Sequence, residues 1–322
     1  MSTSNGTPLV RAATHAGSWY TGSQSRLNSQ LDAFLSKAPP TVPGARVVIG
    51  PHAGYSYAGP TLAQTYKAFD PTNIKRVFIM GPSHHVYFKG SVWTTGCDYY
   101  ETPLGNVKVD TEVINELISK DSKMFKKMTL DADEDEHSFE MHMPFLYKVT
   151  QGSSNGVPKI IPIMVSGTDE KFEKKLADYL KPYFDDDSNA FIISTDFCHW
   201  GARFGYTAYT PDGTIENIKE LSYRSKIPSS SLKIHESIEA LDKKAMEVAS
   251  IGSYAKFKKY IYATENTICG AKPLSILMAL MEPSLTEDTK DGQFKWIGYT
   301  QSSKVVSPSD SSVSYASGYA VI

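Results

Sequence analysis

Short apolar runs rich in β-branched residues alternate along the chain with segments whose apolar residues recur at helical spacing. Such runs are typical of buried strands, and apolar residues three or four positions apart are typical of one helix face. The predicted strands are 46–49, 76–80, 159–165, 190–193 and 313–322. The predicted helices lie around 27–35, 113–118, 172–180 and 234–248, the second of them behind Asp110 as N-cap. The alternation predicts an α/β fold with a central, mostly parallel or mixed sheet flanked by helices.

Two features modify this simple picture. Pro162 lies inside the strand 159–165, and because proline donates no backbone hydrogen bond it moves that strand toward a sheet edge or a bulge. Residues 203–233 are rich in glycine, proline and serine, while apolar segments resume on both sides. We therefore expect a flexible N-terminus over 1–10 and a single α/β domain over 11–322, with a loop-rich insertion at about 203–233.

Composition narrows the class of protein. Lys and Arg number 33 and Asp and Glu 35, so the net charge of −2 disfavours a nucleic-acid partner. Three cysteines cannot form a disulfide framework and suit a reducing compartment. The first ten residues lack a signal-peptide pattern, and the apolar stretch 274–281 is too short for a membrane span. We expect an intracellular, cytoplasmic protein, with the nucleus as a second location.

Three predicted strands end in the same kind of segment. The strand 46–49 runs into Gly50-Pro51-His52, the strand 76–80 runs into Gly81-Pro82-Ser83-His84, and the strand 190–193 is followed by Asp196 and His199. Ligands of open α/β sheets bind outside the carboxyl ends of the strands. A single histidine at a strand end is more often a hydrogen-bonded structural residue, but three such ends together predict one site.

Cys269, which precedes an apolar helical run, is a candidate third member of this site. One interpretation is a small buried hydrophobic residue, and the other is a thiolate at a helix start, stabilised by backbone N–H groups. With His52 and His84 it would provide two imidazoles and one thiolate, a set that suits copper, zinc or iron, with sulfur favouring Cu(I). Cys97 has no such context and is interpreted as structural, while Cys198 is left open between the two interpretations.

Asp196 and His199 are candidates for proton transfer. If the turn after residue 193 is helical, the two side chains share a face, and the carboxylate can orient the imidazole as a general base. A Ser-His-Asp triad is the rival interpretation, but the chain has no G-x-S-x-G sequence.

The acidic run from Asp133 to His142 has two interpretations. Its carboxylates are typical of the first turn of a helix, where they favour the positive end of the dipole. His137 lies at the edge of the run and is within reach of the cleft, whereas His142 is expected to pack near Phe145. His15 and His235 are expected not to be metal ligands.

These residues lie in longer motifs that occur in order along the chain: HAGSWY at 15–20, GPHAGY at 50–55, GPSHH at 81–85, DEDEHSFEMHMPF at 133–145, STDFCHWG at 194–201, NTICG at 266–270 and DSSVSYASG at 310–318. The motifs resemble the Memo family, named for a mediator of receptor-driven cell motility, from about Arg11 to the end of the sequence. Memo proteins are similar in fold to class III extradiol dioxygenases, which hold non-haem iron with two histidines and one glutamate.

The resemblance implies a metal pocket at His52, His84 and Cys269, with Asp196 nearby and His199 at the position of the dioxygenase general base. It implies that Trp19 lines the pocket mouth, where with His137 it would contact a substrate or peptide. Cys269 stands where the dioxygenases place a carboxylate, so ring cleavage is not expected.

Two functions from different classes follow from the residues and the resemblance together. The first is metal-dependent redox activity with one copper or iron ion per chain. The second is a non-enzymatic signalling module that binds phosphotyrosine-containing or other peptides in a dioxygenase-like cleft. Residual hydrolase or dioxygenase catalysis on an unknown small molecule is a third, weaker hypothesis.

Overall fold

A mixed β-sheet forms the centre of the computed structural model, which describes residues 7–282 and 294–322. In the described part of the chain the sheet has nine strands, in the order β10-β14-β2-β9-β3-β8-β4-β7, with β13 also paired to β14. Their bounds are β2 (Ala45–Gly50), β3 (Arg76–Pro82), β4 (Val92–Thr94), β7 (Phe125–Lys127), β8 (Lys159–Val165), β9 (Asn189–Ser194), β10 (His199–Trp200), β13 (Lys295–Gln301) and β14 (Ser312–Val321). The four strands β2, β9, β3 and β8 are parallel to one another, whereas β14 runs antiparallel to β2 and β4 runs antiparallel to β8. The predicted α/β class with a mixed sheet is confirmed.

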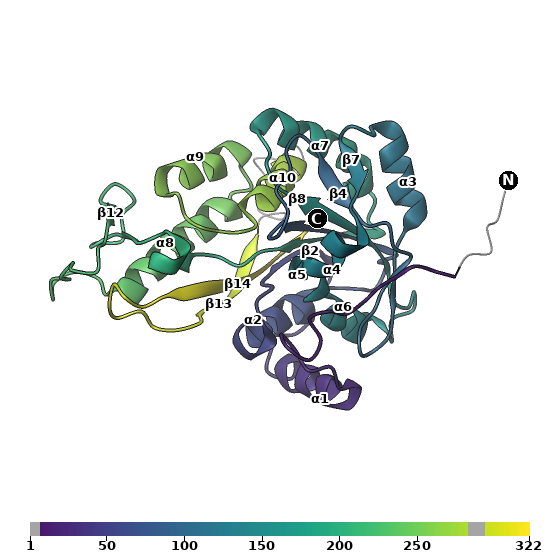
Figure 1. Ribbon diagram of the computed structural model, residues 1–322, viewed down its shortest axis with the longest axis horizontal. Helices are drawn as coiled ribbons and strands as arrows, with labels where there is room; N and C mark the ends of the chain where they lie inside the picture. Colours follow the sequence, from purple (N-terminus) through teal and green to yellow (C-terminus); the bar gives the residue numbers. More distant parts are fainter. Residues whose placement is uncertain (1–6, 283–293) are drawn as a thin grey trace.

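Helices cover both faces of this sheet, as Figure 1 shows. The central strands β2 and β9 are buried at every residue, as expected for strands covered on both sides. On one side lie α1 (Gln24–Leu35), α2 (Tyr55–Ala68) and α6 (Met143–Thr150); on the other lie α7 (Glu170–Phe184), α9 (Tyr254–Thr264) and α10 (Ala271–Met281). The remaining helices are α3 (Thr111–Lys120), α4 (Leu130–Asp135), α5 (His137–Glu140), α8 (Ile234–Ser250) and the 3-10 helix η1 (Ala202–Phe204).

Pro162 occupies an interior strand rather than an edge strand. It pairs with Ile79 in β3, and on its other side β4 pairs only with Met164 and Val165, while Val109 bridges to Ile160. Pro162 therefore sits between two pairings, at a place where the missing N–H breaks no ladder. The prediction of an edge strand is therefore wrong for β8 as a whole, and among the described residues Pro162 lacks a strand partner only on the β4 side.

The N-terminal segment adds a small second sheet. In it, β1 (Val10–Arg11) pairs in parallel with β5 (Tyr99–Tyr100), which pairs with β6 (Val107–Lys108). The Leu9 N–H also donates to Asp98. Residues 1–6 of the predicted flexible start lie outside the described residues, and Leu9 and Val10 are held by these bonds.

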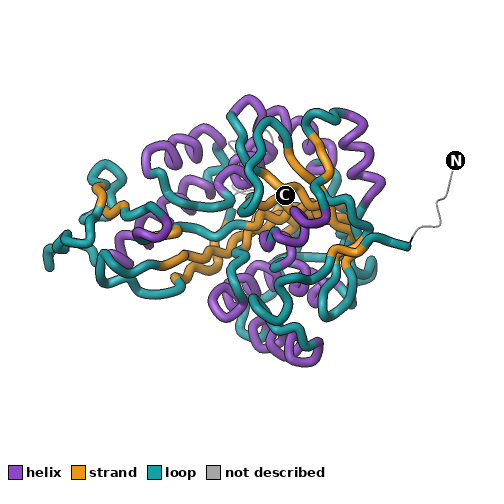
Figure 2. Tube along the Cα trace, viewed as in Figure 1, coloured by secondary structure: helices purple, strands orange, loops and turns teal. Residues whose placement is uncertain are grey.

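Residues 203–233 lie at one end of the molecule, where loops predominate in Figure 2. They contain the short antiparallel pair of β11 (Ala208–Tyr209) and β12 (Lys219–Glu220). A separate hydrophobic cluster, which includes Trp200, Tyr209 and Ile238, anchors the segment to α8. No helix within the described ranges combines the length and the apolar composition that crossing a bilayer requires.

Asp242, on α8, is a buried carboxylate among hydrogen-bond donors. It accepts from the backbone N–H of Cys198, from Nδ2 of Asn266 and from the hydroxyl of Tyr299. Burial, opposed by these hydrogen bonds, raises the pKa of Asp242 to about 6. The carboxyl group therefore holds its proton more tightly in the folded chain than in the unfolded chain, where its pKa is about 3.9.

This difference predicts a pH-dependent stability. From about pH 4 to 6 the unfolded chain loses the Asp242 proton first, so the free energy of unfolding should fall as pH rises, by up to about 1.4 kcal/mol per pH unit. Asp242→Asn should remove that slope. Urea unfolding of both proteins between pH 4 and 7 measures it, and parallel stability curves for the two proteins would contradict the prediction.

Candidate metal centre

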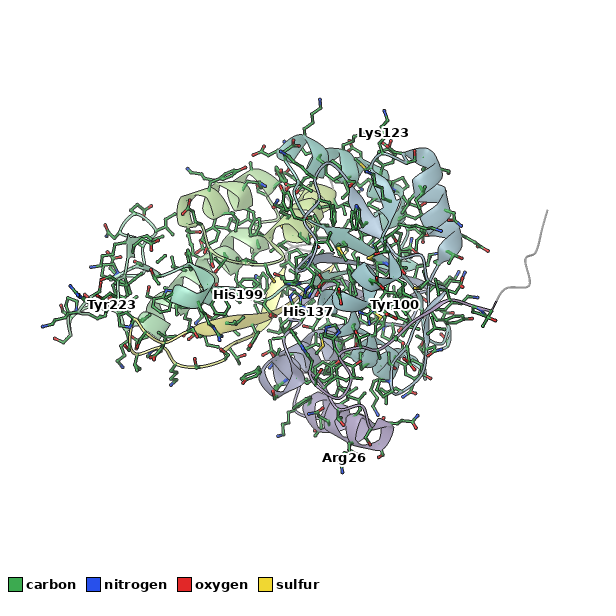
Figure 3. The ribbon with its side chains drawn as sticks, viewed as in Figure 1. Arg26, Tyr100, Lys123, His137, His199 and Tyr223 are labelled. Carbon is green, nitrogen blue, oxygen red and sulfur yellow. The ribbon has the colours of Figure 1, made fainter. Side chains whose placement is uncertain are left out.

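The carboxyl ends of three parallel strands bring the candidate residues to one edge of the sheet. His52 follows β2, His84 follows β3, and Asp196 and His199 come after β9. The rings of His52 and His84 lie 5.0 Å apart between centroids and are nearly perpendicular. Figure 3 labels His137 and His199 near the centre of the view, and the loop tip at Tyr223 far from them. The ends of β2 and β3 therefore bring the His52 and His84 rings together at this edge of the sheet.

His52 presents its Nε2 toward Cys269 because its Nδ1 is held by Ser194. Its Nδ1 lies 2.7 Å from Oγ of Ser194, and the Ser194 hydroxyl already donates its hydrogen to the carbonyl of Ser138. The Ser194 oxygen must therefore accept from Nδ1, which leaves the lone pair on Nε2. Burial, with the neighbouring histidines, also lowers the pKa of His52 well below its ordinary value, so the ring is the neutral form that metals bind.

His84 is held in the same way by a carboxylate. Its Nδ1 lies 2.8 Å from Oε1 of Glu136, and its backbone N–H donates to Oε2 at 2.7 Å. Burial alone would lower the pKa of His84, but hydrogen bonds to Cys269 and Glu136 raise it to about 10. Burial likewise opposes ionisation of Glu136, yet the His84 contact lowers the pKa of that carboxyl group to about 2. A carboxylate behind a histidine is the arrangement that orients metal-binding imidazoles.

Cys269 lies in the loop before α10, with its sulfur beside His52. Sγ is 3.3 Å from Nε2 of His52, and the backbone N–H of Asp196 donates to Sγ at 3.2 Å. Gly270 fixes this approach, because its N–H donates to Oγ1 of Thr195 and an added Cβ would lie 2.4 Å from the Thr195 side chain. Burial raises the pKa of the Cys269 thiol, although His84 opposes the shift. The sulfur thus faces the imidazoles, and its N–H donor comes from Asp196 rather than from α10.

His137, at the start of α5, was predicted to contact a substrate or peptide, but it also lies among the metal-binding candidates. One ring nitrogen from each of His52, His84 and His137 fits within a group whose atoms are all within 4.8 Å of one another. Its ring stacks on His84 with centroids 4.2 Å apart. Burial, together with the nearby His84, lowers the pKa of His137 to about 3. The sequence pattern did not place His137 beside the metal-binding candidates. The available signal was the adjacent Glu136, whose carboxylate contacts the ring of His84.

Asp196 and His199 do not share a helical face, because residues 195–198 form no helix. Asp196 is buried and its Oδ1 accepts from the backbone N–H of His52 at 2.8 Å. Nδ1 of His199 lies 2.9 Å from the Phe197 carbonyl and 3.0 Å from the Thr267 carbonyl. The prediction of a shared helical face is therefore wrong, and two backbone carbonyls fix the His199 ring through Nδ1. In the neutral ring these two acceptors require the hydrogen to be on Nδ1.

Comparison with known proteins identifies the family. The sequence profile described as Memo-like protein matches residues 11–319. This chain belongs to the Memo family. The MEMO1 family protein MHO1 of Saccharomyces cerevisiae is 41% identical, over 97% of this chain and 99% of its own length. Protein MEMO1 of Homo sapiens is 39% identical, over 96% of this chain and 97% of its own. An uncharacterized Escherichia coli K12 protein of known structure aligns with a TM-score of 0.42 at 9% identity, over 84% of this chain and 98% of that chain.

In this Memo family chain, Trp19 forms part of the rim beside the histidines. Its side chain is 37% exposed, and its ring lies 4.4 Å from that of His137. His15 lies 5.5 Å from the Trp19 ring, with its Nδ1 2.8 Å from Oε2 of Glu140. Glu140 is buried and also accepts from Tyr20 and Arg11, so a buried network fixes the rim from behind.

The other titratable candidates of this Memo family chain have structural surroundings. His142 is buried, with Nδ1 2.9 Å from the Tyr66 hydroxyl, and His235 has its Nδ1 3.1 Å from the Val305 carbonyl. Cys97 and Cys198 are also buried. Burial, together with Asp242, raises the pKa of the Cys198 thiol well above its ordinary value, which disfavours a reactive thiolate at this position.

Proposed function

We propose that this Memo family protein binds one copper or iron ion through His52, His84 and Cys269, and that metal-dependent redox chemistry is its activity. The observation that carries the proposal is the approach of the Cys269 sulfur to 3.3 Å from Nε2 of His52. Nitrogen and sulfur donors of one tetrahedral ion lie roughly this far apart, since bonds of 2.0–2.3 Å separate them from the metal.

The chemistry of the donors fits such an ion. Ser194 contacts Nδ1 of His52 and Glu136 contacts Nδ1 of His84, so both rings are held with Nε2 directed toward the candidate metal position. Thiolate and imidazole together suit copper, iron and zinc better than hard cations. Because the thiol of Cys269 and the ring of His84 both hold protons in the free protein, binding would release protons.

Copper or iron, when bound, would supply one-electron chemistry that zinc does not. The chain's own residues would position and protect it. Asp196 fixes the loop that carries His52 by accepting its backbone N–H, and His199 offers Nε2 to a proton beside the site. Because sulfur replaces the carboxylate of the dioxygenases, we propose no ring cleavage and expect catechols to remain unchanged.

Metal analysis of protein purified without added metal tests the proposal. The unaltered protein should contain copper or iron, while His52→Ala and Cys269→Ser should lose it. His235→Ala is the matched control, because its Nδ1 lies 3.1 Å from the Val305 carbonyl and the ring does not belong to the histidine group of the candidate centre. Unaltered metal content in the two ligand variants, or zinc alone in the unaltered protein, would contradict the proposal.

Peptide binding is the second candidate, and a feature beside His199 favours it. Phe204 contacts the His199 ring edge-on with centroids 5.2 Å apart, and the Arg203 guanidinium lies 4.5 Å from the Phe204 ring centroid. Phosphotyrosine recognition uses arginine side chains, and Arg203 is an exposed cation close to His199. Titration with phosphorylated and plain versions of one peptide tests it, and equal affinities would contradict phosphate recognition. A signalling role of this kind would place the protein in the cytoplasm or nucleus.

A further inference from the structure

The candidate metal centre holds more donors than one three-residue set needs. Ring nitrogens of His52, His84 and His137 all lie within 4.8 Å of one another. The sulfur of Cys269 is 3.3 Å from His52 but does not join that group. His52 and His84 are therefore common to two alternatives, and His137 and Cys269 are their different third members.

His137 has an unused ring nitrogen. Its Nδ1 is buried and has no hydrogen-bond partner among the described residues, and Oε1 of Glu136 lies 3.8 Å away. A buried polar atom without a partner costs about 1–3 kcal/mol, so a bound ion or water at His137 Nδ1 would remove that cost. By contrast, the Nδ1 atoms of His52 and His84 are bonded to Ser194 and Glu136.

The orientation of the His137 ring is fixed by its neighbours. It stacks on His84 at 4.2 Å with an angle of 26°, and Trp19 covers it at 4.4 Å with an angle of 35°. The ring of His52 meets it edge-on at 5.2 Å. His137 is thus packed into the cluster that would hold the ion rather than directed into solvent.

We propose that the centre contains two overlapping donor sets: His52, His84 and Cys269 for a soft monovalent ion such as Cu(I), and His52, His84 and His137 for a borderline divalent ion such as Zn²⁺ or Co²⁺. This inference rests on the proposed function, because both sets need His52 and His84. The physical reason is donor softness: thiolate selects Cu(I), whereas imidazole suits divalent ions of the later first-row metals.

Two variants separate the sets. His137→Phe keeps a ring that stacks on His84 and Trp19 but removes both nitrogens, and Cys269→Ser removes the soft donor. Cu(I) affinity is measured anaerobically by competition with a chromophoric chelator, and Co²⁺ binding is followed by its visible absorption. We expect His137→Phe to weaken Co²⁺ binding at least about 10-fold and leave Cu(I) binding unchanged, and Cys269→Ser to do the reverse.

A spectroscopic signature distinguishes ligation from a structural effect. Co²⁺ in the three-imidazole set should show no thiolate-to-cobalt charge-transfer band in the unaltered protein. His15→Phe is the control, because His15 also borders Trp19 and His137 but lies outside the donor group. If His137→Phe does not fold, as judged by circular dichroism, His137→Gln takes its place.

The outcomes for the two proposals differ. Equal losses of both ions in His137→Phe, an undiminished Co²⁺ affinity, or a strong thiolate band would overturn the inference of two donor sets. Retention of both ions by His52→Ala would instead overturn the proposed metal centre itself.

Discussion

Arg11→Met is expected to lower the free energy of unfolding by about 3–5 kcal/mol, because it breaks a fully buried ion pair and leaves the partners without a cation. Arg11 is 0% exposed and forms ion pairs with Glu140 and Asp133. Its guanidinium also donates to the backbone carbonyls of Asp133 and Glu136. The methionine side chain would fill the space but donate no hydrogen bond.

Chemical denaturation of the two proteins at neutral pH measures this loss. The matched control is Lys120→Met, which breaks an exposed ion pair to Glu116 four residues away and should cost only about 0.3–0.5 kcal/mol. Similar losses in the two variants would contradict the assignment of Arg11 as the structural support of the rim. Near-ultraviolet circular dichroism gives a second readout, since Trp19 lies in that rim.

Glu136→Gln is expected to weaken metal binding about 10- to 100-fold without removing a donor atom, because the carboxylate orients His84 from behind. It should also lower the pKa of His84 from about 10, since the negative charge that favours the imidazolium is lost. The second effect is measured by NMR titration of the metal-free protein and does not depend on which metal binds.

The control for this variant is Asp135→Asn. Asp135 is the adjacent exposed carboxylate, so it changes the net charge by the same amount. An unshifted His84 titration in Glu136→Gln, or an equal loss of metal affinity in both variants, would show that the Glu136 contact has no specific role.

The convergence of His52 and His84 could be predicted from sequence because parallel strands place their carboxyl ends on one edge. The helix α2 was not predicted, since Gly59 and Pro60 interrupt its apolar pattern. The mixed sheet was expected, but the short strands β4 and β7 carry too few residues for a period-2 pattern.

The acidic run shows what local reasoning can and cannot supply. Glu136 accepts from the Ser138 N–H as the cap of α5, in line with the helix-start interpretation. Its carboxylate also reaches His84, which precedes it by 52 residues. Only the fold brings these together, and the same is true of His137, whose place beside His52 depends on tertiary packing.

The position of β14 has a consequence for biosynthesis. This strand, formed by residues 312–321, pairs with β2, β10 and β13. Until the ribosome has released that segment, one edge of β2 stays unpaired, and the loop that carries His52 follows an incompletely paired strand. A nascent or prematurely terminated chain therefore exposes an unpaired edge of β2 that can pair with other chains. We expect chaperones or proteases to bind such a chain before it binds a metal ion.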